Sequence, residues 1–149
     1  MTNTPTITVR SPATGTFLLA RWPLALGVGL GIASFGAGAG WVPSGNLTLA
    51  LPGLALSYLV FGAARRHLRQ SGVLNQQLLG LAVLGLLAAV ALVVDPTIGR
   101  YVVATGWLGH AVWDLWHHRL DRVVPRWYAE FCVVFDVLVA TSLVAGPHL

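Results

Sequence analysis

Five long apolar segments alternate with short polar connections along the chain. The apolar segments cover roughly residues 22–41, 47–64, 74–94, 98–116 and 127–145. Each is close to the about 20 residues that an α-helix needs to cross a hydrocarbon layer of about 30 Å. None alternates apolar and polar positions, as a strand of a transmembrane barrel must. The pattern predicts an all-α fold: a polytopic membrane helical bundle with about five transmembrane helices.

The composition agrees with a membrane protein. Hydrophobic residues make up 56% of the 149 residues, charged residues make up 9%, and the mean hydropathy is +0.73. A soluble domain has about a quarter charged residues, so this chain carries too few to cover its surface in water. Residues 1–16 are rich in Thr and Pro and are predicted to form a flexible tail before a single membrane domain over residues 17–149.

All nine basic residues are arginines, and eight of them fall on one side of the predicted bundle. Those eight precede the first segment, follow the second, or lie between the fourth and fifth: Arg10, Arg21, Arg65, Arg66, Arg69, Arg119, Arg122 and Arg126. Only Arg100 falls on the other side. By the positive-inside rule this asymmetry predicts a cytoplasmic N-terminus and an outward C-terminus. Arginines in short loops favour a topological role over nucleic-acid binding, so the expected partner is the lipid bilayer.

Glycines are concentrated in the first apolar segment, as Gly27-x3-Gly31 and Gly36-x3-Gly40. Small residues one turn apart let a second helix approach closely. The pattern favours packing within the chain, and the alternative is a homo-oligomer or a larger membrane complex. The small residues 37–39 resemble a signal-peptide cleavage site, but the length of the apolar segment favours a retained helix.

Ionisable residues gather in the last two segments, whereas the first three look almost purely apolar, without reactive side chains at depth. The set is His110, Asp114, His117, His118, Glu130, Cys132 and Asp136. A charged side chain at the centre of a bilayer costs about 2.5–3.5 kcal/mol on insertion scales. Several such residues on two adjacent helices therefore need an explanation.

Helical geometry predicts which of these side chains meet. His110, Asp114 and His117 fall within about 60° of one another on a helix. In an antiparallel hairpin, equal depth would pair His110 with Asp136 and Asp114 with Cys132.

By the same helical geometry, Glu130 points away from Asp136. Arg126, one turn earlier on the helix, is its expected partner.

Imidazole and carboxylate side chains at this spacing suit a Zn, Fe or Mn site. His110, Asp114 and His117 are the first candidates for ligands, with His118 and Asp136 as alternates. If Asp136 is not itself a ligand, it would fix the tautomer of His110 by a hydrogen bond. A metal bound there could activate water or oxygen against a substrate from the lipid phase.

Other interpretations of the cluster stay open. His–Asp hydrogen bonds between the last two helices would contribute about 0.6–2 kcal/mol each to stability in a purely structural role. A buried His–Asp pair also suits a proton relay, and Gly106, one turn before His110, would leave room for a haem or another flat pigment. An accessory subunit of a larger membrane complex is the alternative from a different class. No serine-hydrolase elbow, phosphate-binding loop or HExxH motif identifies a reaction.

The region from Gly109 to Ala140 contains the pattern H-x2-WD-x2-HH, a Pro-containing connection, and C-x3-D. It falls on His110, Trp113, Asp114, His117, His118, Pro125, Cys132 and Asp136. This pattern resembles a group of small uncharacterised bacterial integral-membrane proteins. The resemblance covers about a fifth of the chain. It implies a bacterial inner-membrane location and carries no activity over to this sequence.

Overall fold

Helices make up nearly all of the structure. The computed structural model of the chain describes residues 21–36 and 44–145, and no β-strand occurs in these ranges. The elements are α2 (Trp22–Gly36), α3 (Ser44–Ala64), a short 3-10 helix η1 (His67–Arg69), α4 (Val73–Val93), α5 (Pro96–Leu120) and α6 (Arg126–Ala145). The predicted all-α fold is confirmed, and each of the five apolar segments forms a helix. The expected tail over residues 1–16, and residues 37–41 at the end of the first segment, lie outside the described ranges.

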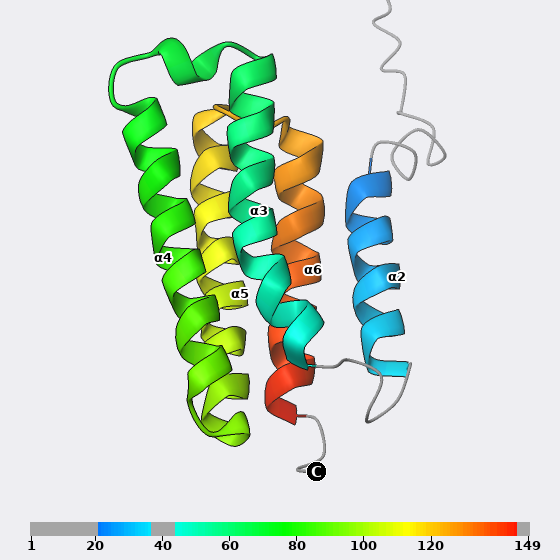
Figure 1. The fold of residues 1–149 in the computed structure, drawn as a ribbon. Coiled ribbons are helices and arrows are strands. Elements are labelled where there is room, and N and C mark those ends of the chain that lie inside the picture. Colours follow the sequence, from blue (N-terminus) through cyan, green and yellow to red (C-terminus); the bar gives the residue numbers. More distant parts are fainter. Residues whose placement is uncertain (1–20, 37–43, 146–149) are drawn as a thin grey trace, which may run out of the picture.

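Helices α3 to α6 run alternately up and down as a bundle of four, and α2 lies outside it, beside α6 (Figure 1). Short connections join α3 to α4, α4 to α5 and α5 to α6, so consecutive helices are antiparallel neighbours. Helix α5 contacts α3, α4 and α6. The helix with the most ionisable residues is therefore the most enclosed one.

Local sequence signals account for both ends of α5. The Asp95 side chain caps the first turn by accepting a hydrogen bond of 2.9 Å from the Thr97 backbone N–H, and Pro96 occupies the first helical position. The helix ends where Asp121 takes a left-handed conformation with φ of 48°. It continues four residues beyond the predicted end at residue 116, so His117 and His118 are helical.

Two apolar clusters stabilise the bundle, one toward each end. The first includes Leu51 of α3, Leu84 and Ala88 of α4, and Val103 and Trp107 of α5. The second includes Tyr58, Val73, Val123, Val124 and Ala129, near the η1 end. Buried polar residues of α5 lie between these clusters along the helix, as the order of residues 107, 110, 114 and 123 shows.

The outer surface of the bundle is strongly apolar. Large hydrophobic side chains such as Val60, Leu86 and Val112 are 65–70% exposed. Within the described residues, three helical ranges are long and apolar enough to cross a membrane: Asn46–Ala64, Val73–Val93 and Arg126–Ala145.

The other two predicted spans fall short of that standard for different reasons. Helix α2 has 15 residues within the described range. Helix α5 has 25 residues, but its histidines, Asp114 and two arginines lower its hydropathy.

Glycines of α2 allow its close approach to α6. A Cβ atom at Gly27 would lie 2.8 Å from the backbone oxygen of Phe131, and one at Gly31 would lie 2.7 Å from Cβ of Leu138. Packing within the chain, the interpretation that the sequence favoured, therefore explains Gly27 and Gly31. Gly40 lies outside the described residues, and Gly36 ends α2.

Candidate metal centre

One histidine and two carboxylates converge inside the bundle. His110 and Asp114 project from α5 one turn apart, and Asp136 projects from α6. Each offers one possible ligand atom, and these atoms all lie within 4.8 Å of one another. Their exposed fractions are 1%, 0% and 0%. The three residues form what we call the His/Asp cluster.

Both carboxylates of the His/Asp cluster face the same ring nitrogen. His110 Nδ1 lies 2.7 Å from Oδ2 of Asp136 and 3.1 Å from Oδ2 of Asp114. The first contact is a hydrogen bond between α5 and α6, which confirms the predicted pairing of His110 with Asp136. The second follows from the i, i+4 spacing on α5.

Tyr58 of α3 extends the cluster to a third helix. Its hydroxyl donates a hydrogen bond to Oδ1 of Asp114, and its ring stands edge-on to that of His110, with 5.5 Å between centroids. Asp114 therefore receives its hydrogen bond from Tyr58 and not from Cys132, which is buried on α6. The prediction that the first three segments lack reactive side chains at depth was wrong, because Tyr58 is only 1% exposed.

His117 lies apart from the His/Asp cluster, although the sequence made it a first candidate for a ligand. Its Nδ1 donates to the backbone oxygen of Trp113 at 2.9 Å, which leaves Nε2 to accept from Nε2 of Gln77 at 3.1 Å. Both ring nitrogens are thus occupied by hydrogen bonds. The sequence analysis also missed Gln77, a buried polar residue on α4.

His118 is also outside the cluster, near the surface. Its Nε2 lies 3.0 Å from Oε1 of Glu130, and both side chains are more than a quarter exposed. Arg126 pairs instead with Asp121, at 3.4 Å. The predicted pairing of Glu130 with Arg126 was therefore wrong, because the helical extension of α5 brings His118 within reach of Glu130.

The His/Asp cluster keeps carboxylate oxygens free for a ligand. Asp114 Oδ2 and Asp136 Oδ1 are buried without a hydrogen-bond partner. Buried polar atoms are seldom left in this state. Ligand atoms of a tetrahedral Zn²⁺ site are about 3.3 Å apart, for metal–ligand bonds of about 2.0 Å. The 2.7 and 3.1 Å between His110 Nδ1 and the two carboxylate oxygens fall short of that spacing by about 0.6 and 0.2 Å. The side chains would therefore have to separate slightly around a small divalent ion.

No family model matches the chain, and no curated protein or solved structure matches it either. The interpretation of the site therefore rests on its own geometry.

The space that Gly106 was expected to leave beside His110 is occupied. A Cβ atom at Gly106 would lie 2.7 Å from Cδ1 of Leu51, so Leu51 of α3 fills the gap. The glycine therefore serves the close packing of α3 against α5, and a flat macrocycle finds no room on that side of the histidine.

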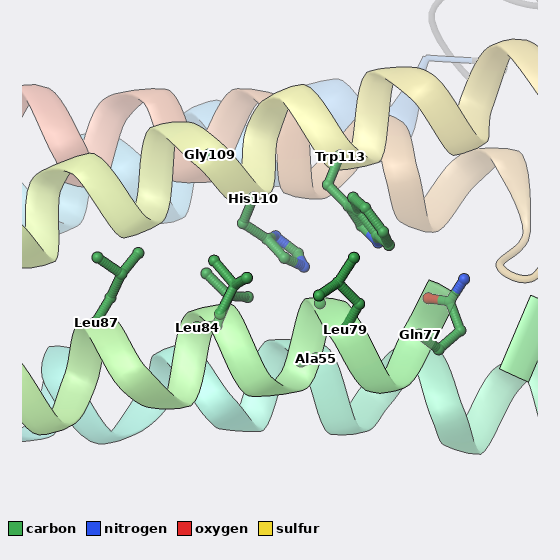
Figure 2. A pocket seen from close by; sticks show the side chains of 10 residues that line it. Ala55, Gln77, Leu79, Leu84, Leu87, Gly109, His110 and Trp113 are labelled. Carbon is green, nitrogen blue, oxygen red and sulfur yellow. The ribbon is translucent and has the colours of Figure 1, made fainter. Parts of the chain in front are cut away.

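A cavity of about 200 Å³ adjoins the cluster on its other side, between α4 and α5. Figure 2 shows the rings of His110 and Trp113 pointing from α5 toward α4, above leucine side chains that line the opposite wall. The cavity is only partly enclosed, and Leu79 and Val83, which line it, are 62% and 48% exposed. It therefore opens sideways, through the apolar outer surface of the bundle.

Proposed function

We propose that this chain is an integral protein of the bacterial inner membrane with five spans. In this proposal it binds one divalent Zn, Fe or Mn ion through His110, Asp114 and Asp136. The observation that carries the proposal is the convergence of two carboxylates and an imidazole, all at most 1% exposed, between α5 and α6.

The membrane part of the proposal is supported by the surface of the bundle. Apolar side chains cover its sides, and three helices have the length and hydropathy of spans. Helix α5, with 25 residues, is about 37 Å long at 1.5 Å per residue, enough for a span. Its polar residues turn inward: His110, Asp114 and His117 are all buried by the neighbouring helices. Polar side chains inside a membrane bundle face its interior in this way.

Charge balance favours a divalent cation in the His/Asp cluster. Two ionised carboxylates beside a neutral imidazole carry a charge of −2, and an uncompensated buried charge costs several kcal/mol. His110 is the contact that both carboxylates share, at 3.1 and 2.7 Å. A divalent ion cancels the charge without requiring extra protons.

Three protein ligands leave a coordination position open, as catalytic metal sites do. A metal held there would supply Lewis-acid chemistry, activating water or polarising an oxygen of a molecule from the lipid phase. Tyr58 holds one oxygen of Asp114 by a hydrogen bond and so directs the other toward His110. The surrounding apolar clusters exclude bulk water from the site.

The proposal is tested by titrating chelator-treated protein in mild detergent with Co²⁺ and recording its visible absorption. We expect saturation at about one ion per chain, with bands typical of N/O ligation. Asp136→Asn and His110→Gln should abolish the absorption. His118→Gln is the matched control, because His118 lies outside the cluster, and it should titrate like the wild type. Equal absorption in wild type and Asp136→Asn would overturn the proposal.

The hydrogen bond between His110 and Asp136 favours a second candidate function. Tyr58, Asp114, His110 and Asp136 form a continuous chain across α3, α5 and α6. With protons in place of a metal, this chain of contacts would hold the helices together or relay protons. Either role would suit an accessory subunit of a membrane complex. Titration without Co²⁺ binding, combined with a loss of stability in Asp136→Leu, would favour that function.

A further inference from the structure

The cavity between α4 and α5 holds two buried polar atoms that nothing in the fold uses. His110 Nε2 and Gln77 Oε1 both lack a hydrogen-bond partner, and both residues line the cavity at 1% exposure. In Figure 2 the oxygen of Gln77 lies on the side of Trp113 and His110, with the nitrogen turned away. An unpaired buried acceptor costs about 1–3 kcal/mol. A ligand that donates a hydrogen bond would recover that cost.

The chemistry of the two atoms limits what the ligand offers. The Gln77 nitrogen donates to Nε2 of His117, which fixes the orientation of the amide. Its oxygen, which can only accept a hydrogen bond, is left for a ligand. His110 Nδ1 faces the two carboxylates, and its Nε2 remains for the cavity. His110 Nε2 carries a proton when Nδ1 holds a metal, or when the ring is charged between the two carboxylates. A single hydroxyl group then meets both requirements, since it accepts from His110 Nε2 and donates to the Gln77 oxygen.

The size and walls of the cavity limit the rest of the ligand. An apolar cavity of about 150 Å³ takes up benzene, so about 200 Å³ accommodates one six-membered ring with substituents. The remaining lining is apolar and includes Leu79, Val83, Leu84 and Trp113. The indole of Trp113 offers a flat wall for a ring. The opening beside Leu79 and Val83 leads to the apolar surface, so an attached alkyl chain would extend into lipid.

We propose that this cavity binds the hydroxyl-bearing ring of a lipid-phase molecule of the quinol or alkylphenol class, with its hydroxyl on Gln77 and His110. The inference rests on the proposed function only in placing the α4–α5 face against lipid. It does not require a metal, because the cavity atoms differ from the three atoms that face one another in the His/Asp cluster.

The test compares two probes in lipid nanodiscs: an alkylated hydroquinone and its dimethyl ether, which keeps the ring and both oxygens but has no O–H. Saturable binding is measured by calorimetry, with empty nanodiscs as the background for partition into lipid. We expect the hydroquinone to bind at least about tenfold more tightly than the ether, the factor that corresponds to one hydrogen bond of about 1.4 kcal/mol. Gln77→Leu should remove this difference.

A second pair of variants guards against indirect effects of Gln77→Leu. Gly109 lines the cavity and Gly85 of α4 does not, while a Cβ atom at either glycine meets nothing within 4 Å. Gly109→Leu should abolish hydroquinone binding, and Gly85→Leu should leave it unchanged. Equal affinity for both probes, or binding that survives Gly109→Leu, would overturn the inference.

Running the assay with and without bound Co²⁺ separates the two proposals. Hydroquinone binding by protein that takes up no metal would support the cavity and refute the metal site. Metal uptake without selective hydroquinone binding would support the metal site and refute the cavity proposal.

Discussion

Tyr58 connects α3 to the His/Asp cluster through its hydrogen bond to Asp114. Its hydroxyl fixes Oδ1 of Asp114, so that Oδ2 turns toward His110. Partners of this kind orient metal ligands, and their loss lowers metal affinity by about 10–100-fold. We therefore expect Tyr58→Phe to weaken Co²⁺ or Zn²⁺ binding by about that factor without unfolding the protein.

Competition with a chelator of known affinity measures this change. Tyr128→Phe is the matched control, because the Tyr128 hydroxyl bonds to Ser57, outside the His/Asp cluster. Equal losses in the two variants would show that Tyr58 acts through general packing.

Asp136→Asn separates the charge of the cluster from its hydrogen bonds. The amide oxygen can still accept from His110 Nδ1, while one of the two negative charges disappears. Because an uncompensated buried charge is costly, we expect metal-free Asp136→Asn to unfold at a temperature no lower than the metal-free wild type. Added Zn²⁺ should raise the unfolding temperature of the wild type only. A variant stabilised by Zn²⁺ as strongly as the wild type would contradict the assigned ligand.

The sequence predicted part of the His/Asp cluster because helical spacing and antiparallel depth determine that part. His110 and Asp136 met as expected. His117 did not join them, although it shares a broad face with His110. Around the helix axis, His117 lies about 60° from Asp114, on the opposite side of His110, and about 4.5 Å further along the axis than Asp114. Its side chain therefore faces α4. Tyr58 and Gln77 were missed because their roles depend on which helices become neighbours of α5. A polar side chain within an apolar run was the signal that each offered.

At the scale of helices, the packing of α2 on α6 depends on small residues. A Cβ atom at Gly31 would approach Cβ of Leu138 to 2.7 Å, and this atom cannot rotate away. We expect Gly31→Ala to force the helices apart and to lower the free energy of unfolding by about 1–3 kcal/mol. Gly29→Ala is the matched control, since its Cβ meets nothing within 4 Å.

Unfolding in mild detergent, followed by circular dichroism, measures both variants. Equal stability of Gly31→Ala and Gly29→Ala would mean that α2 is not packed closely on α6.

The positions of all five helices could be predicted from the lengths of the apolar segments, since each segment was long enough and was bounded by Pro, Gly or Arg. The end of α5 could not, because Trp116–Leu120 has no helix breaker before Asp121 takes its left-handed conformation.

At the scale of the whole molecule, arginines gather at one end of the bundle. Arg21 lies at the start of α2, Arg65, Arg66 and Arg69 lie around η1, and Arg119, Arg122 and Arg126 flank the α5–α6 connection. These segments lie at the same end, whereas Arg100, near the start of α5, lies at the opposite end (Figure 1). From the positive-inside rule we predict that the arginine-rich end faces the cytoplasm.

Reporter fusions test this orientation. A phosphatase that works only outside the cytoplasm should be active when fused after residue 145, and inactive when inserted between residues 69 and 72. A reporter that fluoresces only in the cytoplasm should give the reverse pattern. Activity of both phosphatase fusions, or of neither, would contradict five spans with an inward N-terminus.

The central claim is that three buried side chains hold one divalent ion, and the metal content of the purified protein tests it most directly. Wild type, Asp114→Asn/Asp136→Asn and His118→Gln would be purified in parallel in mild detergent without chelators, and Zn, Fe and Mn measured by elemental analysis against protein concentration. We predict about one ion per chain in the wild type and in His118→Gln, and almost none in the double variant. Metal-free wild type, or equal metal in all three proteins, would contradict the account.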